Sequence, residues 1–138
     1  MYNFHAVTDS RNLCPEGWSV PSDEAFQTLE SSLGISAAEL GQTGWRGTNQ
    51  GDQLKSTEGW YQFGNGSNAL GFNAEPGGRR YRYIGYYQSA GATCFLWSTT
   101  STGGATAVGR ELGWDSDQIN REPGYHKNNG NSVRCLKD

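Results

Sequence analysis

The chain has 138 residues and a formal net charge of -3, and it combines 34% apolar residues with 20 glycines, five tryptophans and seven tyrosines. This length suits one domain, and the composition disfavours a helical bundle because the core must rely on aromatic residues more than on Leu and Ile. The Lys and Arg residues are scattered, which disfavours a nucleic-acid partner. No stretch reaches the roughly 18 apolar residues of a membrane span, and residues 1–12 lack the features of a secretion signal, so we expect no membrane insertion by this domain.

The first 40 residues predict one strand and two helices. Alternating side chains over residues 2–7 (YNFHAV) indicate an early strand. Ser22 is typical of a helix N-cap, two acidic residues follow it in the first turn, and Gly34 ends the helix. Ser36 and Glu39 form a capping box that predicts a second, short helix. The apolar positions on the core face of the first helix are Phe26, Leu29 and Leu33.

From Gly41 onward, helical periodicity is absent, and short apolar or aromatic runs alternate with Gly, Asn and Ser. Such runs are typical of brief antiparallel strands joined by long loops. Two helices followed by a loop-rich β region predict an α+β domain, in which both helices pack on a small antiparallel sheet with long irregular loops. The runs are ALGFNA (69–74), RRYRYIGYY (79–87), CFLWSTT (94–100), TAVGREL (106–112) and NSVRCL (131–136).

The three cysteines, Cys14, Cys94 and Cys135, leave two alternatives open. They lack CxxC spacing, and only His5 and His126 could complete a metal site, so the sequence disfavours zinc. A bridge between Cys14 and Cys135 would close almost the whole domain into one loop, which the chain-entropy model values at about 4–5 kcal/mol. The alternative is that both are buried thiols in a reducing cell.

Five ordered blocks resemble the Fibrobacter major paralogous domain family over residues 2–138. The resemblance implies a C-type-lectin-like fold, which is similar to the formylglycine-generating-enzyme fold, with the two termini close together. It therefore predicts one domain over residues 1–138, a disulfide between Cys14 and Cys135 with Cα atoms closer than about 7 Å, and a free Cys94. The blocks are CPEGWSVPSDEAFQTLESSLG, GWRGTNQGDQLKSTEGW, GFNAEPGGRRY, FLWSTT and NSVRCLKD.

The apolar positions of the expected helix and strands, together with the family-like blocks, predict a set of core residues. These are Trp18, Phe26, Leu29, Phe72, Trp97, Val133 and Leu136.

An enzyme is disfavoured. The formylglycine-generating relatives use a pair of cysteines and a copper ion, and neither Cys94 nor Cys135 has a cysteine a few residues away. Neither histidine lies in a recognisable triad or nucleophile-elbow context. We therefore expect no catalytic residue and no cofactor.

A calcium-dependent sugar site is the next alternative, because Asp115, Asp117 and Asn120 offer hard oxygen ligands close to an EPG at 122–124. In sugar-binding relatives an EPN- or QPD-type motif precedes a WND-type motif, whereas here the order is reversed. The EPGG at 75–78 belongs to a family-like turn. A sugar-coordinating calcium is disfavoured on this ground, and a purely structural cation is left open.

The segment of about 105–129 predicts a binding face, because it is rich in charged, aromatic and polar residues, and only Ala107, Leu112 and Ile119 are spaced like interior residues. Some family members are variable proteins of diversity-generating retroelements, in which this segment is rewritten. The residues Trp114, Arg121 and Tyr125 are of types that often dominate binding energy. We expect these ligand-binding residues to cluster on one exposed surface: Val108, Glu111, Gly113, Trp114, Asp115, Asp117, Gln118, Asn120, Glu122, Tyr125 and His126.

The expected function is therefore a non-enzymatic ligand-binding domain that recognises a protein or glycan surface. The expected location is extracellular, on a cell surface as part of a longer protein, or on a phage or virion surface. The alternative is a structural or adhesion module of a larger cell-surface protein, and a formylglycine-generating-type enzyme ranks third.

Overall fold

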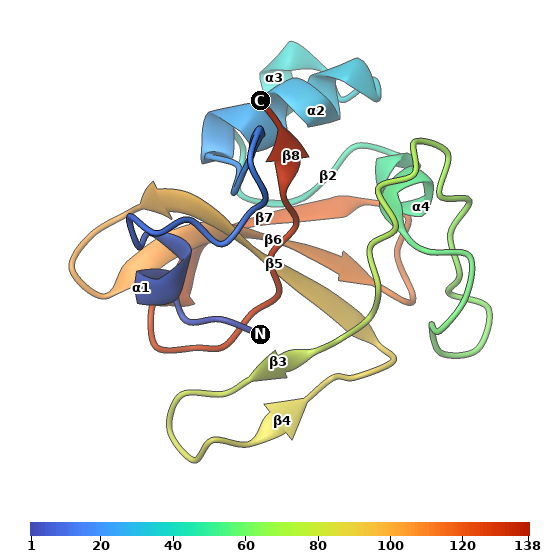
Figure 1. Cartoon of the computed structure of the whole chain (residues 1–138). Coiled ribbons are helices and arrows are strands. Elements are labelled where there is room, and N and C mark those ends of the chain that lie inside the picture. Colours follow the sequence, from blue (N-terminus) through green and yellow to red (C-terminus); the bar gives the residue numbers. More distant parts are fainter.

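The computed structural model describes residues 1–138 and is built around a four-stranded antiparallel sheet with the strand order β2-β7-β6-β5 (Figure 1). Two small antiparallel ribbons, β1-β8 and β3-β4, lie beside it. The central strands are β2 (Gly44–Arg46), β5 (Thr93–Ser101), β6 (Thr106–Gly113) and β7 (Ile119–His126). The ribbons consist of β1 (Trp18–Ser19) with β8 (Leu136–Lys137), and β3 (Arg79–Arg80) with β4 (Tyr87–Gln88).

Four short helices surround the sheet: α1 (Phe4–Val7), α2 (Asp23–Ser32), α3 (Ala37–Leu40) and α4 (Gln50–Leu54). The α2 prediction is confirmed, because the Ser22 hydroxyl accepts a hydrogen bond from the Ala25 amide at 3.2 Å and the helix ends before Gly34, whose φ is +100°. The second predicted helix is also confirmed as α3. The expected strand over residues 2–7 is wrong, since the Asn3 side chain accepts from the Ala6 amide and caps α1 there.

The predicted fold class is wrong. The structure is mostly β, with 31% of residues in strands and 17% in four short helices, and it has several antiparallel sheets. It is therefore not the expected C-type-lectin-like α+β domain with two helices packed on a small sheet. Helix α4 was not predicted, and β7 lies in a segment that was expected to be loop.

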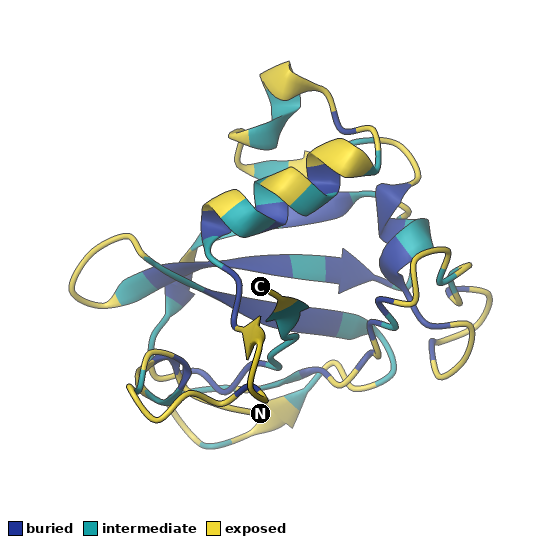
Figure 2. Ribbon diagram, turned by 45° about the horizontal axis from the view of Figure 1, so that its top comes forward, coloured by how far each residue is buried: buried dark blue, intermediate teal, exposed yellow.

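Both faces of the central sheet are buried, as Figure 2 shows by the dark strands between the surrounding segments. Successive residues of β5 point to opposite faces, so Leu96 belongs to one core and Trp97 to the other. The first core includes Phe26, Ile35, Leu54, Trp60, Phe72, Cys94, Leu96, Leu112 and Ile119. The second core consists of Phe4, Val7, Cys14, Val20, Phe95, Trp97, Ala107 and Tyr125.

The core prediction is confirmed for Phe26, Phe72 and Trp97, which are buried, and for the inward positions Leu112 and Ile119. It is wrong for Trp18, which is 42% exposed because the short β1-β8 ribbon leaves one side of the indole uncovered. The other three predicted core residues are partly buried against the two cores: Leu29, Val133 and Leu136.

The predicted disulfide between Cys14 and Cys135 is present, with a Cα–Cα distance of 5.9 Å across 121 residues of sequence. The bridge lies beside the β1-β8 ribbon, where the Ser19 and Leu136 positions are paired. Cys94 is free, as predicted, and is buried in the first core. Burial raises the pKa of the Cys94 thiol to about 12, which makes it a poor nucleophile.

Candidate functional site

The strands β6 and β7 are attached to α2 by a buried network of charges. The guanidinium of Arg110 contacts Glu30 at 2.5 Å and Asp23 at 2.8 Å, while Arg46 contacts Glu30 at 2.9 Å and Arg121 contacts Asp23 at 2.6 Å. Three of these residues, Glu30, Arg46 and Arg110, are 1% exposed. Arg110 on β6 and Arg121 on β7 therefore point towards α2 and stabilise the fold.

The carboxyl group of Asp23 illustrates how the network is balanced. Burial raises its pKa, but hydrogen bonds from Arg121 and Arg110 outweigh that effect and hold the pKa below its ordinary value. The same hydrogen bond to Asp23 raises the pKa of Arg121. The ionised pairs therefore keep β6 and β7 in register against the helix.

The opposite face of the sheet carries a row of side chains that are free of this network. Trp45 on β2 pairs directly with Asn120 on β7, which pairs directly with Glu111 on β6. Directly opposite residues project to the same face, so these three side chains are neighbours. The Asn120 amide donates to Glu111 Oε2 at 3.1 Å, and the Tyr125 hydroxyl donates to the same oxygen at 3.2 Å.

Two features distinguish this row from the rest of the sheet. Trp45 is 42% exposed, although tryptophan is usually largely buried. Asn120 is only 9% exposed, and its Oδ1 atom is buried without a hydrogen-bond partner. Such an orphaned acceptor is uncommon in a folded protein. Burial, and then the nearby Glu111 carboxylate, raises the pKa of Tyr125 well above its ordinary value, so its hydroxyl remains a donor.

The turn that joins β6 to β7 over residues 114–118 is fixed by hydrogen bonds from α4 and from Lys55, which follows it. The buried Lys55 ammonium donates to the carbonyl oxygens of Gly113 at 3.3 Å and Ser116 at 3.0 Å, and it lies 3.6 Å from the Asp117 carboxylate. The Gly51 amide donates to the Asp117 carbonyl at 2.7 Å. A turn fixed in this way presents its outward side chains with little entropy left to lose on binding.

Gly113 joins the turn to the row. A Cβ atom built there would lie 3.0 Å from Asp115 Oδ1 and 3.4 Å from Trp45 Cη2, so the indole and the carboxylate meet over the glycine backbone. We call Trp45, Glu111, Asp115, Asp117 and Asn120 the recognition patch. It combines one exposed aromatic ring with three carboxyl groups and one amide, and it lies on β2, β7 and β6 and on the turn between β6 and β7, near α4.

The structure brings together only part of the predicted ligand-binding set. Asp115 and Asp117 are exposed, as expected. The prediction of one exposed surface is wrong for four residues that are buried because β6 and β7 have cores on both faces: Val108, Gly113, Asn120 and Tyr125. Five more are half-buried: Glu111, Trp114, Gln118, Glu122 and His126.

Sequence analysis did not identify Trp45. This residue lies inside a family-like block, and its exposure depends on β2 being an edge strand beside β7. The preceding Gly44, with φ of +95°, is the local signal of an irregular entry into that strand.

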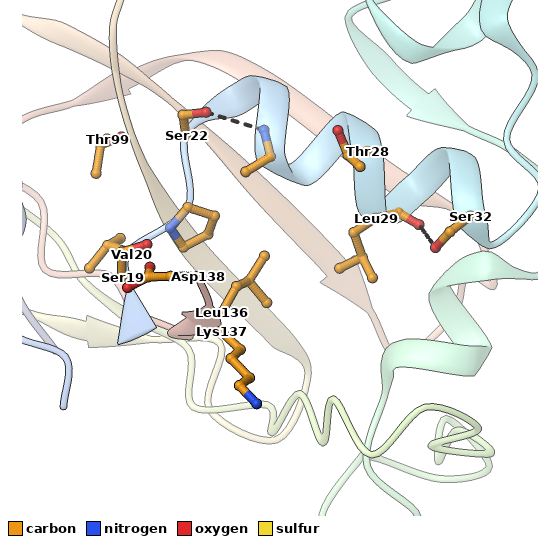
Figure 3. Close-up of a pocket in the computed structure, with 12 residues that line it drawn as sticks. Ser19, Val20, Ser22, Thr28, Leu29, Ser32, Thr99, Leu136, Lys137 and Asp138 are labelled. Atoms are coloured by element: carbon orange, nitrogen blue, oxygen red, sulfur yellow. Dashed lines mark hydrogen bonds between the residues drawn. The ribbon is translucent and has the colours of Figure 1, made fainter. Parts of the chain in front are cut away.

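The largest cavity, of about 640 Å³, lies elsewhere, between α2 and the β1-β8 ribbon (Figure 3). Two of its hydroxyl groups are engaged with the helix, since Ser22 accepts from the Ala25 amide and Ser32 donates to the Leu29 carbonyl at 2.7 Å. Lys137 and Asp138 are its ionisable residues. The cavity is therefore a groove in which no nucleophile is paired with a base.

The remaining candidates for chemistry are separate from one another. His5 lies on the exposed side of α1, and His126 ends β7 with its Nδ1 accepting from the Asn128 amide at 3.2 Å. No group of three or more His, Cys, Asp or Glu side chains in the structure could hold a metal ion. None of the helices is both long and apolar enough to cross a membrane.

These features define a β-rich domain closed by one disulfide, with a charge network under one sheet face and a rigid polar and aromatic patch at the sheet edge. The model of the Fibrobacter succinogenes major domain matches residues 1–137, and the chain belongs to this family. No curated protein and no solved structure matches the chain.

Proposed function

We propose that this domain is a non-enzymatic binding module whose recognition patch contacts a protein or glycan surface. The observation that carries the proposal is the exposed Trp45 ring beside the exposed Asp115 carboxylate, since both groups lie over Gly113. An exposed aromatic ring can stack on the C–H face of a sugar or on a cationic side chain, while carboxylate and amide groups accept hydrogen bonds at its edge. The turn held by Lys55 supplies these groups in fixed positions.

The proposed location is an extracellular or cell-surface one, or a phage or virion surface, with the domain forming part of a longer protein. The disulfide between Cys14 and Cys135 supports this proposal, because disulfides persist mainly in oxidising compartments.

Replacing Trp45 by alanine is expected to weaken binding about thirtyfold, which corresponds to the roughly 2 kcal/mol of a central aromatic contact. The measurement is binding of the labelled domain to an array of printed glycans and of peptides rich in Lys and Arg. Trp18→Ala is the matched control, because Trp18 and Trp45 are both 42% exposed and Trp18 lies on the β1-β8 ribbon. An equal loss for both variants, or no bound probe, would contradict the proposal.

The sharper form of the proposal is that a retroelement diversifies this surface. The buried strands restrict such diversity to side chains that point outward. We expect a library randomised at Asp115, Asp117 and Glu122 to keep melting temperatures within a few degrees of the parent, since surface changes usually stay within about 0.5 kcal/mol each.

The matched library randomises the buried residues Val108, Gly113 and Tyr125, and most of its members are expected to unfold below the parent temperature because the core is disrupted. Thermal melts of both libraries decide the issue. If the outward library also fails to fold, the segment has a purely structural role.

A further inference from the structure

The hairpin formed by β3 and β4 carries four large exposed side chains within five residues. Tyr83, Ile84, Tyr86 and Tyr87 are exposed by 67%, 79%, 62% and 65%. Four large apolar side chains that adjoin one another on a soluble domain mark an interaction surface. The recognition patch does not include them, so the hairpin requires a separate explanation.

The hairpin is also basic. Arg80 is exposed, and Arg82 is half-buried and donates from its guanidinium to the Tyr83 hydroxyl; neither forms an ion pair, and the chain has no acidic residue between Glu75 and Glu111. The Arg82 guanidinium carbon lies 4.1 Å from the centroid of the neighbouring Tyr83 ring, and the Arg80 guanidinium lies against the turn, where a Cβ on Gly85 would be 2.6 Å from its Nη2 atom. Positive charge is thus placed beside the exposed rings.

The body of the protein holds the hairpin in position. Arg80 and Gly130 exchange two backbone hydrogen bonds of 2.8 Å, and the Arg82 amide donates to Asn129 Oδ1 at 3.2 Å. The Tyr81 amide donates to the Tyr86 carbonyl at 2.7 Å across the hairpin. The apolar and basic side chains are therefore presented on a fixed backbone.

We infer that the hairpin of one copy of this chain docks on the recognition patch of a second copy, an inference that rests on the proposed binding role of the patch. The two surfaces are complementary. Arg80 and Arg82 provide guanidinium groups for the Trp45 ring and for the Asp115 and Asp117 carboxylates, through cation–π and charge-assisted contacts.

In this structure the tip of the hairpin and the turn between β6 and β7 lie apart (Figure 1). The hairpin projects to the lower left in Figure 1, whereas the turn between β6 and β7 lies beside α4 on the right. A contact between them is therefore heterologous and joins different copies. A ten-residue hairpin is small for a stable protein interface, so the association is weak, reversible and dependent on ionic strength.

Two variants test the inference, each of which removes one surface and keeps the other. The hairpin variant carries Arg80→Glu and Arg82→Glu, and the patch variant carries Trp45→Ala and Asp115→Lys. Sedimentation velocity of the wild type at low salt is expected to show an average mass that rises with protein concentration. Each variant alone is expected to associate at least tenfold more weakly, and 0.5 M NaCl is expected to have the same effect on the wild type.

The equimolar mixture is the decisive measurement, because it offers a native hairpin on one chain and a native patch on the other. It is expected to regain association and to stop at a one-to-one complex. Arg11→Glu, at an exposed position on another segment, is the control for a reversed surface charge and is expected to behave as the wild type. Melting curves show whether each variant remains folded.

The inference is overturned by a wild type that stays monomeric at millimolar concentration and low salt, by variants that associate normally, or by a mixture that does not recover. A hairpin that binds vesicles of anionic lipid while the chain stays monomeric also overturns it and assigns the hairpin to a membrane surface. The two proposals can also be separated. If the wild type does not self-associate but Trp45→Ala abolishes its binding to the array, this inference is refuted and the proposed function is supported.

Discussion

Replacing Glu30 by leucine is expected to lower the free energy of unfolding by about 3–5 kcal/mol. Glu30 is buried and pairs with both Arg46 and Arg110. Its removal leaves Arg46 with only the Leu40 carbonyl as a hydrogen-bond partner and removes one of two carboxylates that offset three guanidinium groups. The cost is large because a buried charge without its partner loses hydration and gains nothing in return.

The measurement is urea unfolding at neutral pH, followed by circular dichroism. Glu24→Leu is the matched control, since Glu24 lies on the exposed side of the same helix, and we expect it to cost less than about 1 kcal/mol. Arg110→Leu is expected to cost less than Glu30→Leu, because Arg46–Glu30 and Arg121–Asp23 then remain as two complete pairs. Equal stability of the Glu30 and Glu24 variants would show that the network does not hold the sheet on α2.

The same network explains why sequence analysis missed the strands β2 and β7, although the runs at 94–100 and 106–112 predicted β5 and β6. Arginine is usually exposed to solvent, so the sequence suggests surface positions for Arg110 and Arg121. The acids that neutralise them lie 80 to 98 residues away in the chain. No local pattern indicates such a pairing. Helix α2, in contrast, was predictable because its cap, first-turn acids and terminal glycine lie within a short segment.

Only part of the recognition patch was predictable from the sequence. The sequence identified the outward residues of the turn, Asp115 and Asp117, from their polarity. It did not distinguish the outward Glu111 from the buried Val108 on β6, because a β-bulge between Ala107 and Gly109 interrupts the alternation. Side-chain direction across an irregular strand depends on its partner strand, which the sequence does not specify.

Removal of the disulfide is the second change for which a large effect is expected. The double variant Cys14→Ser with Cys135→Ser is expected to lose up to about 4–5 kcal/mol of stability, because the bridge spans 121 residues and strongly restricts the unfolded chain. In the folded state the bridge accompanies a ribbon of only two residue pairs, Trp18 with Lys137 and Ser19 with Leu136. Such a short ribbon is marginal by itself.

Urea unfolding of the wild type with and without reductant, and of the double variant, provides the measurement. The double variant should be insensitive to reductant, and a Cys94→Ala variant should lose as much stability on reduction as the wild type, because Cys94 is free and buried. Hydrogen exchange should show faster exchange first in β1 and β8, while the amides of β5, β6 and β7 stay protected. Unchanged midpoints after reduction would show that packing of the second core around Val20 and Trp97 holds the two ends of the chain together without the covalent bond.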